Sequence, residues 1–261
     1  MNTSLSNQST PTAAPMRAEN VSPQGVGRLF TVELRKTIDT RSGRTMLASV
    51  MLLSIAIAVW AAVKSFSTQV DFRDLLEGIA LPMTMLLPVV GVLAMTSEWS
   101  QRTALTTFTL SPRRLRVLLC KVGAALVIGV VMTAAAVALA LIAYPIATSH
   151  NAVLHTNAGM GASILGTFIA VLLNILMGAA FGAVLTISAA ALVTYFAAPL
   201  LWTTLGTKVF GSSAKWLDIA DAVQRISTRA LSGTWPQTIS SIVVWIVIPM
   251  AVGLSVRREV K

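Results

Sequence analysis

The sequence has few charged residues for its length, and this shortage limits the kind of protein it can form. Asp, Glu, Lys and Arg make up 11% of the 261 residues, whereas they make up roughly 25% of a soluble domain. Hydrophobic residues make up 55%. So few charged groups cannot cover the surface of a protein of this size with well-hydrated side chains. We therefore expect much of its surface to contact lipid rather than water.

Groups that carry catalysis are also scarce. Cys120 is the only cysteine, so no intramolecular disulfide can form. His150 and His155 share one polar segment with no Cys, Asp or Glu beside them, which favours solvated loop residues over metal ligands. The phosphate-binding pattern Gly-x-x-x-x-Gly-Lys-Ser/Thr is missing. The sequence therefore predicts no catalytic, cofactor-binding or metal-binding residues, and a chain that is not an enzyme by itself.

Six apolar segments approach or reach the roughly 20 residues that a helix needs to cross about 30 Å of hydrocarbon. Their predicted bounds are 45–63, 78–96, 117–143, 161–187, 189–205 and 237–256. A charged loop at 64–77 joins the first two, Tyr144 and Pro145 are expected to end the third, and an uncharged turn at 186–188 separates the fourth from the fifth. These segments predict an all-α, polytopic integral membrane protein with six transmembrane helices.

Two segments precede the first span. Residues 1–24 are rich in Ser, Thr, Asn, Gln, Pro and Ala, a composition typical of a disordered tail. Over about 26–40, apolar residues recur at helical spacing, with charged residues between them. An amphipathic basic helix beside a span is typical of an interfacial helix lying in the membrane plane. The alternative is a solvated helix packed on a soluble partner.

The distribution of Lys and Arg predicts the orientation. Six spans place both termini on one side, and if that side is the cytosol, fourteen of the twenty Lys and Arg residues are cytosolic. The other six lie in outer segments together with five acidic residues. The excess of cations on the inside predicts cytoplasmic N- and C-termini. We attribute the net charge of +10 to contact with anionic membrane lipid rather than with nucleic acid.

A basic stretch lies between the second and third spans. It opens with Glu98, and its cations are Arg102, Arg113, Arg114, Arg116 and Lys121. Ser111 can cap a helix, and the ring of Pro112 suits a first helical turn. We therefore expect one short helix to end near residue 110 and another to begin at Pro112. The residues alone leave two interpretations: a docking handle for another protein, or an ordinary loop that sets topology.

This stretch resembles the signature of the type-2 ATP-binding-cassette (ABC) permeases, a family of drug, antibiotic and polysaccharide exporters. The matching positions are Glu98, Thr103, Pro112, Arg113 and Lys121. The doublet Arg113–Arg114 looks like that of actinobacterial members. The resemblance covers the whole chain: an amphipathic N-terminal helix, six spans, and a longer outer segment before the last span.

The resemblance implies a six-span permease domain over 25–261 in the bacterial plasma membrane. Such a permease pairs with itself or with a sister subunit, and each half docks a separate ABC ATPase subunit. The coupling loop would cover about 97–116, and the residues that couple to the ATPase would be Glu98, Arg102, Thr103, Pro112, Arg113 and Lys121. The expected cargo is an amphipathic drug, antibiotic or lipid-like molecule. The alternatives are a non-transporting sensor or scaffold and, disfavoured by the absence of charge near the middle of any span, an ion-coupled carrier.

Two further features concern the packing of the spans. Asn174 and the pair Gly178-x-x-x-Gly182 are candidates for helix–helix interfaces in the fourth span, because small residues allow close approach and an amide can bond a neighbouring helix. In the outer segment at about 206–236, apolar residues at helical steps predict an amphipathic surface helix or a shallow re-entrant element. The resemblance implies that this segment helps to form an outer gate.

Overall fold

The computed structural model describes residues 25–64, 71–100, 114–149, 159–228 and 232–259. Every element in these ranges is a helix. The longer ones are α1 (Val26–Asp39), α2 (Arg41–Lys64), α3 (Phe72–Ser100), α5 (Arg114–Thr148), α6 (Met160–Val184) and α7 (Ser188–Leu201). The others are η1 (Trp202–Gly206), α8 (Thr207–Phe210), η2 (Gly211–Trp216), α9 (Ile219–Ser227), α10 (Trp235–Ile242), η3 (Val243–Val247) and α11 (Ile248–Glu259).

Six stretches of helix are long and apolar enough to cross a membrane, so the chain is a multi-pass membrane protein. They are Arg41–Val63, Phe72–Ser97, Leu115–Thr148, Met160–Val184, Ser188–Trp216 and Trp235–Ser255. The fifth runs from α7 through η1, α8 and η2, past its predicted end at 205, and the sixth comprises α10, η3 and most of α11. This confirms the all-α architecture and the number of spans. The cytoplasmic location of the termini and the interfacial position of α1 stay predictions.

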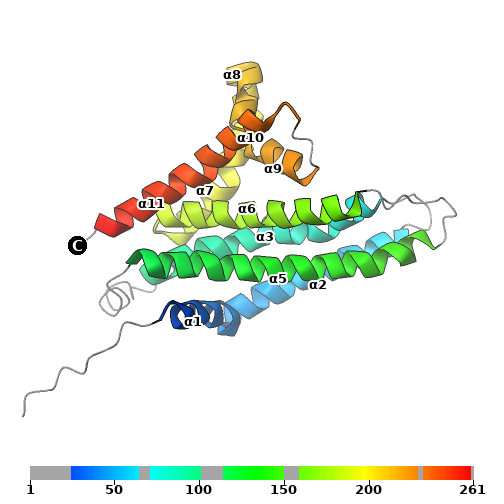
Figure 1. Ribbon diagram of the computed structural model, residues 1–261, viewed down its shortest axis with the longest axis horizontal. Coiled ribbons are helices and arrows are strands. Elements are labelled where there is room, and N and C mark those ends of the chain that lie inside the picture. The colour runs from blue at the N-terminus through cyan, green and yellow to red at the C-terminus, as the bar shows by residue number, and fades with distance from the viewer. Residues whose placement is uncertain (1–24, 65–70, 101–113, 150–158, 229–231, 260–261) are drawn as a thin grey trace, which may run out of the picture.

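The helix at the centre of the fold is α6. It contacts α3 along most of its length, and also packs on α5, α7, α9 and α11. Figure 1 shows α3, α5 and α6 lying side by side, with α2 and α1 on one side of this layer. On the other side, α7 leads away from the layer toward α8, and α10–η3–α11 returns from there to the C-terminus. The large buried side chains gather where α2, α3, α5 and α6 meet.

The third span is longer than predicted. The sequence predicts that Tyr144 and Pro145 end it, but α5 continues through Pro145 to Thr148. A proline removes its own N–H from the helical ladder and crowds the carbonyl one turn before it, and a packed membrane helix tolerates both effects. The hydroxyl of Thr148 donates to the carbonyl of Tyr144 at 3.0 Å, which satisfies an acceptor at the end of the helix.

The predicted loop before the second span is partly helical. Residues 64–77 are expected to form a loop, but α3 begins at Phe72. Arg73 and Glu77 lie four residues apart on α3, and Nε of Arg73 is 2.9 Å from Oε1 of Glu77. Asp74 lies in the first turn, where the helix dipole favours an acidic residue. Glu77 is therefore placed by a helix, and not by a loop.

Candidate functional site

A cavity of about 590 Å³ lies between α3, α6, α7 and α9. Its volume is within the range of roughly 300–1,000 Å³ that is usual for sites that bind small molecules. Most lining side chains are apolar, among them Leu81 and Met85 from α3, Phe196 from α7 and Val223 from α9. Thr84, Thr167, Asn174, Thr203, Gln224 and Ser227 add uncharged polar groups. This mixture suits a largely apolar molecule that also makes a few hydrogen bonds.

Asn174 and Tyr195 form a polar pair in the wall of this cavity. Nδ2 of Asn174 donates to the carbonyl of Ala170 within α6 at 2.9 Å, and the hydroxyl of Tyr195 donates to Oδ1 of Asn174 at 3.0 Å. The second bond joins α6 to α7. The start of α7 is fixed as well, because the hydroxyls of Ser188 and Thr96 lie 2.8 Å apart. Asn174 thus holds a neighbouring helix and lines the cavity at the same time.

We expect Tyr195→Phe to weaken the contact between α6 and α7 only modestly. The substitution removes one hydrogen bond and keeps the ring, and side-chain hydrogen bonds between membrane helices contribute about 0.6 kcal/mol on average. Unfolding of the purified protein in mixed detergent micelles measures the change. Thr204→Val is the matched control, since the Thr204 hydroxyl bonds only to carbonyls of its own helical segment. A loss larger than about 2 kcal/mol would contradict the expectation.

The short helix α9 forms one wall of the cavity, and its sequence explains its position. Asp218 caps its start by accepting a hydrogen bond from the backbone N–H of Asp221 at 3.1 Å. Ile219 is buried, and Val223 packs in the same apolar cluster. On the polar face, Arg225 forms an ion pair with Asp221. The amphipathic helix expected at about 206–236 is therefore present, and its apolar face turns toward the spans. Its place at the outer surface stays a prediction.

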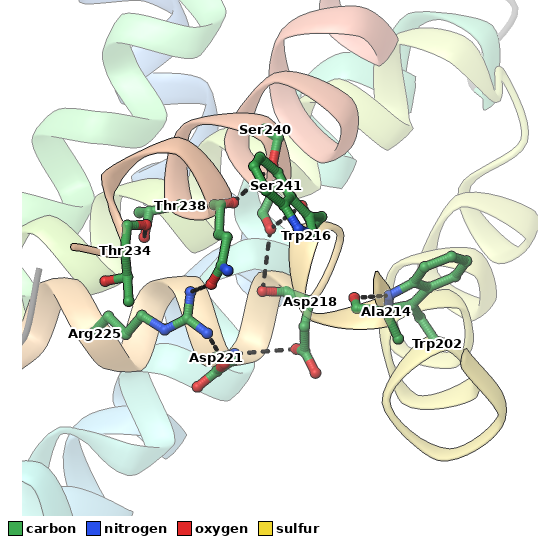
Figure 2. Close-up of polar contacts among 11 residues, drawn as sticks. Trp202, Ala214, Trp216, Asp218, Asp221, Arg225, Thr234, Thr238, Ser240 and Ser241 are labelled. Carbon is green, nitrogen blue, oxygen red and sulfur yellow. Dashed lines mark hydrogen bonds and ion pairs between the residues drawn. The ribbon is translucent and has the colours of Figure 1, made fainter. Parts of the chain in front are cut away.

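Polar contacts hold α9 and the segment before it against α10 (Figure 2) and against η3. The hydroxyls of Ser240 and Ser241 donate to the carbonyl of Trp216 at 2.6 and 3.0 Å. The guanidinium of Arg225 donates to Oε1 of Gln237 at 3.2 Å. The indole of Trp245 donates to the carbonyl of Leu217 at 2.7 Å. The carbonyls of Trp216 and Leu217 belong to a turn without regular helical partners, so the last span supplies the hydrogen-bond donors that this turn lacks.

Among the described residues that line the cavity, Glu77 is the one acidic or basic residue. It lies in the second turn of α3, close to the end of the bundle at which α6 begins (Figure 1). Hydropathy does not single out Glu77, because it falls in the loop predicted over 64–77. The spacing of Arg73 and Glu77, four residues apart, is the signal that could have placed it on a helix.

The glycines predicted for a helix–helix interface lie where α6 crosses α3. A Cβ built on Gly178 would collide with the carbonyl oxygen of Pro88, and one built on Gly182 would lie 2.8 Å from the carbonyl oxygen of Val92. From the other side, a Cβ on Gly91 would lie 2.5 Å from the carbonyl oxygen of Ile175. The two backbones touch at this crossing, which fixes the distance between two of the helices that line the cavity.

Lys121 lies at the start of the third span and is paired within its own chain. Its side chain is 1% exposed, and Nζ is 2.8 Å from Oε2 of Glu33 on α1. Close by, the ring of Phe30 packs 3.3 Å from where a Cβ on Gly123 would lie. Lys121 therefore joins the N-terminal helix to the third span. A contact of Lys121 with an ATPase would have to act through α1.

The other predicted coupling residues are largely beyond what the structure describes. Arg102, Thr103, Pro112 and Arg113 lie outside the described residues, as do the predicted helix start at Pro112 and the predicted disordered tail over 1–24. Of the predicted helix over 98–110, residues 98–100 continue α3, and residues 101–110 lie outside the described residues. Glu98 belongs to the last turn of α3. Their role in coupling stays a prediction.

Within the described part of the chain, no group of three or more His, Cys, Asp or Glu residues is placed to hold a metal ion. His150 and His155 lie outside it. Comparisons of the sequence with models of known protein families and with curated proteins found no match.

Proposed function

We propose that this protein is the membrane-spanning subunit of an ATP-driven exporter of the type-2 ABC class. It carries an amphipathic molecule across the bacterial plasma membrane, and it works as a pair, with itself or with a sister subunit. A separate ATPase subunit supplies the energy. The single observation that carries the proposal is the cavity between α3, α6, α7 and α9, because a transporter needs a binding site among its spans.

The position of the cavity along the spans supports this function. Asn174 lies near the middle of α6, and Glu77 lies near one end of α3, so the lining extends from mid-span toward one surface. The short helix α9, which connects two spans, covers part of it. A wall made by a short helix outside the spans can move with less disruption than a wall made by a complete span.

The proposed coupling elements lie at the opposite end of the bundle. The end of α3 and the beginning of α5 flank the basic stretch, and α1 packs on α5 beside them (Figure 1). Both α3 and α5 contact α6, so a movement of the ends of these two helices is transmitted directly to α6. In this proposal, the ATPase moves the basic stretch, and α3 and α6 transmit the movement to the cavity.

We expect Arg102→Ala to reduce ATP-driven uptake by about tenfold, which corresponds to roughly 1.4 kcal/mol of lost coupling. The reason is the loss of a charged contact with the ATPase, while the spans stay intact. The tagged chain is purified in mild detergent with the ATPase that accompanies it and reconstituted in proteoliposomes. Uptake of a fluorescent amphiphile is then measured with and without ATP.

Lys208→Ala is the control, because it removes a cation from α8 at the other end of the spans. Its uptake should equal that of the unchanged protein. Undiminished uptake after deletion of residues 98–110 would overturn the proposed coupling. If no amphiphile is taken up, and none changes the ATPase rate, the non-transporting sensor or scaffold becomes the better interpretation.

A further inference from the structure

The cavity has one charged group in an otherwise uncharged lining. Oε1 of Glu77 accepts from Nε of Arg73 at 2.9 Å. Among the described residues, Oε2 of Glu77 makes no hydrogen bond and no ion pair. The Arg73 side chain does not line the cavity, whereas Glu77 does. One carboxylate oxygen is therefore left for a group that enters the cavity.

The ion pair with Arg73 does not cancel this charge for a ligand. The two side chains are 36% and 37% exposed, and exposed pairs four residues apart on a helix contribute little to stability. Asp74, three residues before Glu77, lies on the same face of α3 and is exposed. At this end of α3, Glu77 and Asp74 supply two carboxylates and Arg73 supplies one guanidinium, which favours a cation over an anion.

The opening of the cavity selects molecules that dissolve in the bilayer. Leu81 and Met85 on α3 are 51% and 52% exposed, and Phe196 and Leu200 on α7 are 44% and 63% exposed. The same four residues line the cavity. The cavity is therefore open between α3 and α7, on the apolar side of two membrane spans, and a molecule in the lipid can reach it without first crossing the aqueous phase.

We propose that this cavity binds amphipathic cations, with the positive group at Glu77 and the apolar part among Leu81, Met85, Phe196 and Val223. This inference rests on the proposed function, because it names the class of molecule carried. A carboxylate at the edge of an apolar cavity attracts a cation and repels an anion of the same shape. The apolar walls favour a bulky hydrocarbon part over a hydrophilic ion.

The test uses two ions of nearly the same size and shape and of opposite charge, tetraphenylphosphonium and tetraphenylborate. The dissociation constant of each is measured for the purified full-length protein in detergent micelles, and again for Glu77→Gln. The ratio of the two constants for each ion, variant over unchanged protein, removes the different partitioning of the ions into micelles. We expect this ratio to be about tenfold or more for the phosphonium and no greater than one for the borate.

Two further variants locate the site. Asp74 lies one turn before Glu77 and does not line the cavity. Asp74→Asn removes a charge of the same sign there, and we expect the affinity of this variant for the phosphonium to change by less than about threefold. Ala220→Phe fills part of the cavity from α9 and should weaken the binding of phosphonium in proportion to the lost space. Equal ratios for both ions in Glu77→Gln, or unchanged phosphonium binding in both Glu77→Gln and Ala220→Phe, would overturn the inference.

These measurements need neither ATP nor an ATPase. Selective binding of the phosphonium without ATP-driven uptake would contradict the proposed export and leave the cation site standing. ATP-driven uptake of neutral amphiphiles, with no preference for the phosphonium, would contradict the cation site and leave the proposed export standing.

Discussion

Replacement of Lys121 by methionine is expected to loosen α1 from the start of the third span by about 3 kcal/mol. The Lys121 side chain is 1% exposed, so the ammonium depends on its partners in the protein for the interactions that water would otherwise provide. Methionine has a similar length and no charge, and it leaves the Glu33 carboxylate without the ammonium at 2.8 Å. Because Glu33 is 14% exposed, water can solvate part of its carboxylate. We therefore expect a loss of stability at the lower end of the range for breaking a buried ion pair.

Hydrogen exchange of the α1 backbone is the direct measurement. A loss of about 3 kcal/mol should speed the exchange of amides in Val26–Asp39 by about a hundredfold, while amides in the middle of α6 keep their rates. A local effect is expected because α1 has no buried residues of its own and is held by contacts with α5 and α2.

A double substitution separates charge from packing. In Glu33→Leu/Lys121→Met both charges are gone, and replacing a buried pair with apolar groups is often neutral or stabilising. We therefore expect the double variant to recover most of the protection lost in Lys121→Met. Arg35→Met removes an exposed cation from the same helix and should change exchange by less than threefold. Similar exchange in Lys121→Met and Arg35→Met would show that the ion pair does not hold α1.

The second large effect is expected at the crossing of α3 and α6. In Gly178→Ala, the added methyl group meets the carbonyl oxygen of Pro88, which belongs to a helix backbone and cannot rotate away as a side chain could. The two helices must separate, so we expect a loss of about 1–3 kcal/mol in the free energy of unfolding, in spite of the higher helix propensity of alanine. Unfolding in mixed detergent micelles measures it.

Two glycines of the same helix supply the comparison. A Cβ on Gly161 would have no neighbour within 4 Å, so Gly161→Ala should be neutral or stabilise the protein by up to about 1 kcal/mol. A Cβ on Gly182 would lie 2.8 Å from the carbonyl oxygen of Val92 and 3.1 Å from Cβ of Met95, which predicts an intermediate loss. Equal stability of the Gly161 and Gly178 variants would contradict the close crossing.

The crossing also bears on the proposed transport. Gly178 lies one turn after Asn174, so a change in the distance between α3 and α6 alters the width of the cavity. If the cavity binds the cargo, Gly178→Ala should weaken the binding of tetraphenylphosphonium as well as stability, whereas Gly161→Ala should leave the binding unchanged and should not lower stability.

Much of the fold follows from hydropathy and spacing along the sequence. The number of spans was predictable because the hydrocarbon core imposes a length and an apolar composition on every crossing helix. The turn near 186–188 agrees with the structure, in which α6 ends at Val184 and α7 begins at Ser188. The ends of the spans were less predictable. In the sequence, Glu77 interrupts an apolar run and Pro145 interrupts the pattern of helical hydrogen bonds. In the structure both residues lie within helices, because packing and local pairing extend those helices past them.

The sequence alone determined that this protein is helical, crosses the membrane and has an amphipathic segment before its last span. Only the tertiary structure decided which residues meet. It brought Lys121 to Glu33, Gly178 to Pro88 and Tyr195 to Asn174, and it joined residues of four helices into one cavity. The physical reason is that lipid is as apolar as the side chains between the helices, so hydropathy cannot distinguish a face that contacts lipid from a face that contacts protein. Shape and a few polar contacts choose the partners.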